Sequence, residues 1–88
     1  MPRYIVVHRT PSELGQEQLV ADIKKLVAHL PPGVHWLNSW FSPKEGGLFC
    51  EWDAPDADAV QASLAPFESL VPIETIYEVE WIDPAWFD

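Results

Sequence analysis

The sequence predicts an α+β domain of the ferredoxin-like type, with the element order β-α-β-β-α-β. Three observations predict it: strand-like segments near both ends, two segments whose apolar residues recur at helical spacing, and a strand–turn–strand segment at the centre. Right-handed crossovers would place both helices on one face of a four-stranded antiparallel sheet. We expect residues 1–88 to form one such domain, with residues 83–88 as a C-terminal tail that packs on the body or on a partner.

The N-terminal residues predict a strand followed by a helix. The segment Arg3–Arg9 is rich in β-branched and aromatic residues, which is typical of a strand. Alternation along it gives two faces, with Tyr4, Val6 and His8 opposite Ile5 and Val7. A loop at Thr10–Ser12 and an N-cap at Gly15 lead into a helix over residues 16–30, which Pro31 ends. The helix is predicted from one apolar stripe: Leu19, Val20, Ile23, Leu26, Val27 and Leu30.

Residues 33–55 are expected to form two strands joined by a turn, because Gly46 and Gly47 supply turn chemistry between two apolar runs. In the strand over residues 34–42, alternation places three residues on one face: Trp36, Asn38 and Trp40. In the strand over residues 48–53, Phe49 and Glu51 are opposite Leu48, Cys50 and Trp52.

The C-terminal half predicts a second helix and a last strand. Asp56 is expected to cap the helix and Pro66 to end or kink it. Val60 and Leu64 are expected to form its buried stripe, which could extend to Phe67. The last strand is expected over residues 73–82. Its two faces are Thr75, Tyr77, Val79 and Trp81 against Glu74, Ile76, Glu78 and Glu80.

The charge balance and the cysteine count limit the partners and the compartment. The chain has 5 basic and 14 acidic residues, a formal net charge of −9 and no basic cluster, so we expect neither nucleic acid nor an anionic membrane as a partner. No apolar run reaches the roughly 18 residues of a membrane span, and because the first residues lead straight into a strand pattern we expect no signal peptide. One cysteine excludes an internal disulfide and favours the cytoplasm.

The fold has a consequence for function. With both helices on one face, the other face of the sheet has no cover from the same chain, and its strands are too apolar to lie in water. A second copy would cover it, giving a homodimer with facing sheets. Polar groups between the two sheets would then line a pocket.

Residues along most of the chain resemble a family of small bacterial ferredoxin-like domains of unknown function that includes nickel-binding proteins. The similarity runs from Tyr4 to Val79 and is densest over residues 33–55. It lies in these motifs: Gly33-Val34-His35-Trp36, Ser39-Trp40, Phe49-Cys50, Ala54-Pro55-Asp56, Ala59-Val60, Pro72 and Glu78-Val79. The resemblance implies a homodimer related to the dimeric α/β-barrel proteins.

The nickel-binding branch of that family implies sites rich in imidazole. His8 and His35 fall where this branch carries histidines, and imidazole suits nickel and zinc. The chain departs from the branch in two places. His29 lies near the end of the first helix and not at the branch's position, and residues 60–72 (VQASLAPFESLVP) contain no histidine. As isolated residues, His8 and His35 could instead be satisfied histidines of the core or the rim, and His35, just after the junction between helix and strand, could bond to backbone groups.

Two further kinds of chemistry can be weighed from the residues. Cys50 lies mid-strand between Phe49 and Glu51, which favours a buried packing residue over a nucleophile or soft ligand. Glu51 and Glu78 could share a sheet face with Asn38, and a desolvated carboxylate there could act as a general base. The alternative is that both carboxylates lie at the rim and bond to Arg3 or Arg9.

The sequence therefore predicts a cytoplasmic homodimer that binds a small ligand or a metal ion between its sheets. The expected ligand-binding residues are Trp36, Asn38, Trp40 and Glu51, with His8 and His35 as metal ligands for nickel or zinc. One alternative is a cofactor-independent enzyme of the dimeric α/β-barrel type that uses Glu51, Glu78 or His8 as base. The other is a module for dimerisation or partner docking, without a site.

Overall fold

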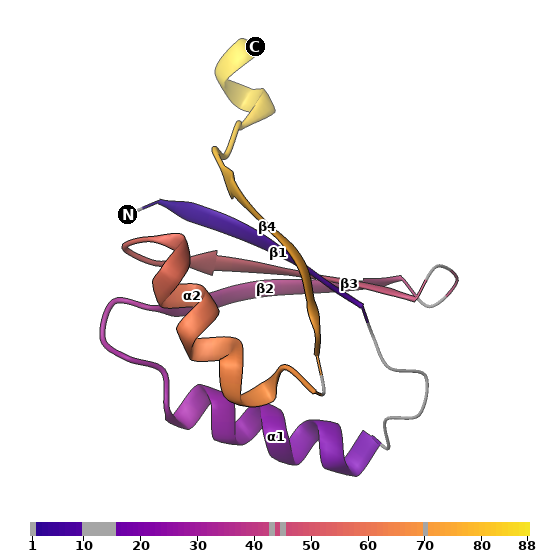
Figure 1. The fold of residues 1–88 in the computed structure, drawn as a ribbon. Helices are drawn as coiled ribbons and strands as arrows, with labels where there is room; N and C mark the ends of the chain where they lie inside the picture. Colours follow the sequence, from indigo (N-terminus) through magenta and orange to yellow (C-terminus); the bar gives the residue numbers. More distant parts are fainter. Residues whose placement is uncertain (1, 10–15, 43, 45, 70) are drawn as a thin grey trace.

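The computed structural model describes residues 2–9, 16–42, 44, 46–69 and 71–88, and it confirms the predicted order of elements (Figure 1). The expected loop at Thr10–Ser12 and N-cap at Gly15 lie outside the described residues. The elements in chain order are β1 (Arg3–Arg9), α1 (Gln16–Ala28), β2 (His35–Ser42), β3 (Gly47–Asp53), α2 (Ala57–Leu64), the 3₁₀ turn η1 (Ala65–Phe67), β4 (Ile73–Val79) and the 3₁₀ turn η2 (Pro84–Phe87).

The four strands form one antiparallel sheet in the order β2-β3-β1-β4. β1 is therefore central, paired with β3 on one side and β4 on the other. Directly opposed residues of neighbouring strands share a face, so the register fixes which side chains meet. This strand order is the one that the ferredoxin-like prediction requires.

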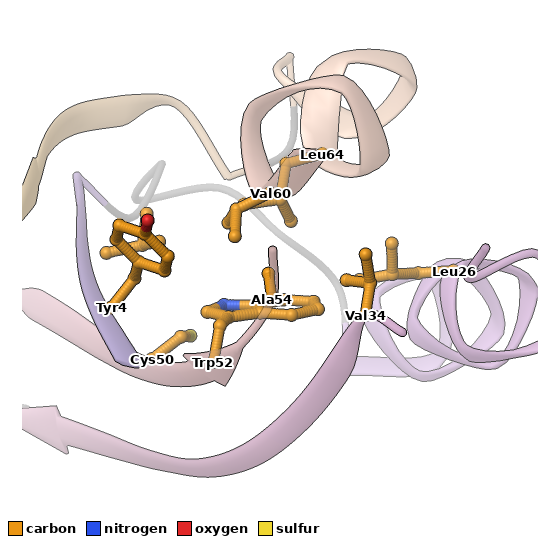
Figure 2. Packing of buried hydrophobic residues seen from close by; sticks show 9 residues of the cluster. Tyr4, Leu26, Val34, Cys50, Trp52, Ala54, Val60 and Leu64 are labelled. Carbon is orange, nitrogen blue, oxygen red and sulfur yellow. The ribbon is translucent and has the colours of Figure 1, made fainter. Parts of the chain in front are cut away.

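One face of the sheet supports the hydrophobic core, which both helices help to form (Figure 2). The sheet contributes Tyr4, Val6, Cys50 and Trp52, all of them buried. Val60 and Leu64 of α2 lie over these side chains, and Leu26 of α1 packs beside Val34. Cys50 is 6% exposed, which confirms that it is a packing residue.

The expected burial of the α1 stripe is wrong for two of its residues. Leu26 is buried, but Val20 and Val27 are 49% and 50% exposed. Leu26 lies near the C-terminal end of α1 and packs beside Val34 in the core. The helix therefore packs on the rest of the protein over a narrower strip than its sequence pattern implies. Val20 and Val27 therefore remain at the surface.

The second helix and the last strand follow the sequence with one change of length. Asp56 caps α2, because its side chain accepts a hydrogen bond of 2.7 Å from the backbone nitrogen of Ala59. The α-helix ends at Leu64, and the turn η1 contains Pro66. β4 ends at Val79, three residues earlier than expected, and the chain continues away from the sheet into η2 (Figure 1). None of the helices that the structure describes is both long and apolar enough to cross a membrane.

Candidate functional site

The face of the sheet opposite the core is the candidate functional surface, called here the open face. The strand register assigns its residues, which are Arg3, Ile5, Val7 and Arg9 of β1; His35, Asn38 and Trp40 of β2; Phe49, Glu51 and Asp53 of β3; and Thr75, Tyr77 and Val79 of β4. All of these residues belong to the four strands. The open face thus corresponds to the uncovered sheet surface that the sequence predicts.

Apolar side chains dominate the middle of the open face. Trp40, Phe49, Val7 and Thr75 are opposed across the four strands in one row. Trp40 and Phe49 are 54% and 39% exposed, and Tyr77 in the neighbouring row is 57% exposed. Exposed aromatic residues gathered on one face are typical of a surface that binds a partner or a ligand.

A polar cluster lies beside this apolar row. Asn38 Nδ2 donates a hydrogen bond of 2.9 Å to Glu51 Oε1, and Arg3 Nε lies 3.3 Å from Glu51 Oε2. The Glu51 side chain is 13% exposed, whereas that of Arg3 is 36% exposed. One carboxylate oxygen therefore accepts from an amide and the other pairs with a guanidinium, so Glu51 is held in place on the open face.

The register shift in β2 corrects the prediction for Trp36. Trp36 is opposite Trp52, but Asn38 is opposite Glu51, so Leu37 is an extra residue in β2. Such a β-bulge reverses which side chains face the core. Trp36 consequently shares the core face with Trp52, at a ring-centroid distance of 6.3 Å. The structure brings together three of the four expected ligand-binding residues, Asn38, Trp40 and Glu51, without Trp36.

Trp36 instead anchors a short hydrogen-bond chain on the core side. Its Nε1 donates to Ser39 Oγ at 2.8 Å, and Ser39 Oγ donates to Cys50 Sγ at 3.0 Å. Burial raises the pKa of the Cys50 thiol, an effect that the Ser39 hydroxyl partly offsets. A protonated, buried thiol is a poor nucleophile, in keeping with its packing role.

The prediction that Glu78 shares a face with Glu51 is also wrong. Glu78 is opposite Tyr4, a core-face residue, and its Oε1 accepts a hydrogen bond of 3.3 Å from the Tyr4 hydroxyl. Glu51 lies on the other face, opposite Ile5. The two carboxylates therefore cannot act together on one substrate within a single chain.

His8 is a buried histidine of the core face. It is 2% exposed, and its Nδ1 lies 3.0 Å from the carbonyl oxygen of Val71. Burial lowers the pKa of His8, although hydrogen bonds to the backbone of Val71 and Pro72 oppose this effect. His8 thus matches the alternative of a satisfied histidine in the core, with the Val71 carbonyl as its partner.

The two predicted metal ligands lie far apart in one chain. His35 is exposed at the start of β2, opposite Asp53, which in turn is opposite Arg3. His8 lies five positions after Arg3 on β1, or roughly 17 Å along the strand. Since His8 also lies on the core face and His35 on the open face, these histidines do not form a metal site together within one chain.

Nickel ions need several nitrogen, oxygen or sulfur ligands around one point. Among the described residues, no group of three or more histidine, cysteine, aspartate or glutamate side chains is placed to hold a metal ion. His35 has Asp53 as its cross-strand neighbour, which would supply two donors at most. The described residues of one chain therefore do not fit a nickel site.

Two hollows lie against the helices. A mostly apolar groove of about 480 Å³ runs between α1 and α2 and is lined by Leu26, His29, Pro31, Ala59, Ala62, Ser63, Pro66 and Phe67. A second hollow of about 430 Å³ lies between α2 and β4. Neither contains a residue that the sequence predicts as a ligand or catalytic residue.

Of the apolar row, only Trp40 is among the site residues that the sequence predicts. The sequence assigns Val7 and Phe49, and Tyr77 of the neighbouring row, to strand faces but not to a site. Alternation in the first strand already separates Val7 from the core residues Tyr4 and Val6. That alternation, combined with the antiparallel order of the strands, is the signal from which the row could have been found.

The fold and the open face define a small ferredoxin-like α+β protein. The chain belongs to a family described as "Nickel responsive protein SCO4226-like", whose model matches residues 4–79. The structure of SCO4226 from Streptomyces coelicolor A3(2) superposes with a TM-score of 0.71 at 24% sequence identity, covering 92% of this chain and 99% of that one. This likeness shows the fold.

A second solved structure is more distant. It is a Chloroflexus aurantiacus J-10-fl protein named for antibiotic biosynthesis monooxygenases, with a TM-score of 0.46, 18% identity, and coverage of 92% of this chain and 94% of that one. No curated protein sequence matches the chain.

Proposed function

We propose that the protein is a cytoplasmic homodimer, similar in architecture to the dimeric α/β-barrel proteins, that binds a small ligand or a metal ion between its two sheets. The observation that carries this proposal is the composition of the open face. It combines exposed aromatic side chains, Trp40, Phe49 and Tyr77, with a polar cluster fixed around Glu51. Residues 1–88 act as one domain in this proposal.

The dimer follows from the energetics of exposed apolar surface. Leaving Trp40, Phe49 and Tyr77 in water forgoes about 25 cal/mol for each Å² that could be buried. In a two-fold dimer the same patch meets itself, so each apolar contact occurs twice. The shallow surface of one sheet would then become an enclosed space with the polar cluster at its wall.

The ligand would be small and would present both a flat apolar part and a polar group. Trp40 offers a ring for stacking, and the Asn38 amide beside Glu51 offers a hydrogen-bonding group. Arg3 pairs with Glu51, so the cluster is not a bare carboxylate that would select a cation by charge alone. This arrangement supports binding more than catalysis.

The geometry does not favour the alternative of a cofactor-independent enzyme. A general base needs a carboxylate or imidazole free to take a proton from the substrate. Glu51 is occupied by Asn38 and Arg3, Glu78 lies on the core face, and His8 is buried.

The family description suggests nickel as one ligand to test. Because one chain does not gather enough ligands, we infer that nickel would need donors from two chains, with His35 as the exposed imidazole. Calorimetric titration of the wild-type protein with nickel and with zinc, beside His35→Ala and His8→Ala, tests this. We expect His35→Ala to weaken binding at least tenfold; equal affinity in all three proteins would contradict the assignment.

The small-ligand proposal is tested by a thermal-shift screen of aromatic carboxylates and amides. Hits are expected to lose their effect in Asn38→Ala and Trp40→Ala but to keep it in Val27→Ala, a matched exposed residue on α1. Hits that stabilise all three variants equally would place the binding site elsewhere.

A further inference from the structure

The last nine residues form an apolar arm that leaves the body of the protein. The arm comprises residues 80–88 and extends from the end of β4 (Figure 1). Its large side chains are exposed: Trp81 60%, Ile82 63%, Trp86 62% and Phe87 77%. The match to the family ends at residue 79, so the arm lies outside it.

The arm has local order of its own. Trp81 and Trp86 contact each other edge to face at a centroid distance of 5.4 Å. Asp83 caps the turn η2, because its Oδ1 accepts a hydrogen bond of 3.0 Å from the backbone nitrogen of Ala85. A preformed turn that presents aromatic side chains loses little entropy on binding, as suits a docking element.

From these features we propose that the arm of each protomer packs on the open face of a second copy, so that the two chains exchange arms across the dimer. This inference rests on the proposed homodimer and adds to it the segment that completes the interface. The arm continues from β4, whose Tyr77 and Val79 already belong to the open face. The arm therefore begins at the edge of the open face.

The area that a stable dimer buries supports the second copy as the occupant. A standard interface buries roughly 800 Å² per partner. With aromatic side chains worth about 150–250 Å² each, the exposed parts of Trp40, Phe49 and Tyr77 supply only roughly 200–400 Å². The arm's Trp81, Trp86 and Phe87 supply a further 300–500 Å², roughly, on the same basis.

An exposed arginine at one end of the open face suits the acidic arm. The arm carries three acidic residues, Glu80, Asp83 and Asp88, and no basic one. Both arginines of the chain, Arg3 and Arg9, belong to the open face. The Arg9 side chain is 78% exposed and lies 3.7 Å from Glu74, so it remains accessible to a partner's carboxylate.

The first test measures self-association by sedimentation equilibrium of the full chain. The variant Trp86→Ser/Phe87→Ser is compared with Val20→Ser/Val27→Ser, which removes similarly exposed apolar residues from α1. We expect the arm variant to weaken the dimer on the order of 100-fold and the control to change it less than threefold. An unchanged dimer in the arm variant would overturn the inference while leaving the proposed homodimer intact.

The second test locates the arm by cross-linking. Chains carrying Phe87→Cys are mixed with chains carrying Val7→Cys on the open face or Ala62→Cys in the groove between α1 and α2. Val7→Cys is expected to give a disulfide-linked dimer, and Ala62→Cys is not. A disulfide that forms only with Ala62→Cys would contradict arm exchange. So would a disulfide between positions 87 and 7 that forms within a chain carrying both cysteines but not between two chains. A monomeric wild-type protein would instead overturn the homodimer itself.

Discussion

Asn38 and Glu51 are joined across β2 and β3 by a hydrogen bond of 2.9 Å on the open face of the sheet. They meet because one extra residue, Leu37, precedes Asn38 and turns the rest of β2 over. The same bulge sends Trp36 to the opposite face, where it stacks on Trp52. Two tryptophans of one strand thereby acquire different roles.

Replacing Trp36 and replacing Trp40 by serine should therefore affect different properties, folding stability in one case and dimer affinity in the other. Trp36→Ser removes the stack on Trp52 and is expected to lower the free energy of unfolding by about 2 kcal/mol, because a half-buried core residue is lost. Trp40→Ser should change the unfolding free energy of the monomer by less than about 0.5 kcal/mol but weaken the dimer. Urea unfolding at low protein concentration, with sedimentation at high concentration, separates the two effects. Equal effects of both variants on both measurements would contradict the assignment of faces.

The hydrogen bond between Asn38 and Glu51 should be measurable as a coupling. Asn38→Ala and Glu51→Leu, alone and combined, form a double-mutant cycle whose interaction energy we expect to be about 0.5–1.5 kcal/mol. A coupling near zero would mean that Asn38 and Glu51 do not bond in solution.

The ion pair between Arg3 and Glu51 should contribute less. Arg3→Met keeps the side-chain stem and removes the charge, so it should lower the free energy of unfolding by about 1 kcal/mol or less and lose this effect at high salt.

His8 should lower the free energy of unfolding as the pH falls below the ordinary pKa of histidine. Because burial lowers the pKa of His8 in the folded state, the unfolded chain binds the proton first as the pH falls. Stability is therefore unaffected by His8 above about pH 6.5 and decreases as the pH falls below it.

A His8→Gln variant provides the control for that prediction. It cannot titrate, so the slope of unfolding free energy against pH between about 5 and 6.5 should become smaller than in the wild type. Urea unfolding at half-unit pH steps measures both slopes. Parallel slopes would show that His8 does not carry the effect.

Cys50 should be unreactive until the protein unfolds. It is buried, and burial raises the pKa of its thiol. We expect Ellman's reagent at pH 8 to modify it at the rate of global unfolding, and to react immediately in denaturant. Ser39→Ala removes the hydroxyl that donates to Cys50 Sγ. The rate of Cys50 modification in this variant should rise no more than its rate of unfolding does. Rapid modification of the native protein would contradict the burial of Cys50.

Local patterns were enough to predict most of the fold. The bounds of β1 match the prediction because Arg3–Arg9 alternates without interruption, and Asp56 was recognisable as an N-cap. The sequence of β2, in contrast, alternates smoothly through Leu37 and contains no glycine or proline that marks a bulge. The bulge directly follows Trp36, which stacks on Trp52, and this contact between strands is not contained in the pattern of one strand.

The residues of the open face were predicted in part for a related reason. Asn38, Trp40 and Glu51 were placed together correctly, since all three lie beyond the bulge or on β3. Glu78 was assigned to the wrong face, because alternation within β4 separates two sets of residues but does not say which set faces the helices. Its pairing with Tyr4 decides that, and a register between strands follows from the fold as a whole.

The molar mass in solution is the most direct test of facing sheets. Light scattering coupled to size exclusion should give twice the chain mass of 10.0 kDa for the wild-type protein at micromolar concentration. Phe49→Glu, which puts a charge in the middle of the open face, should reduce it to a single chain mass, whereas Val27→Glu on α1 should leave it unchanged. A wild-type protein that remains at 10.0 kDa up to millimolar concentration would contradict the homodimer.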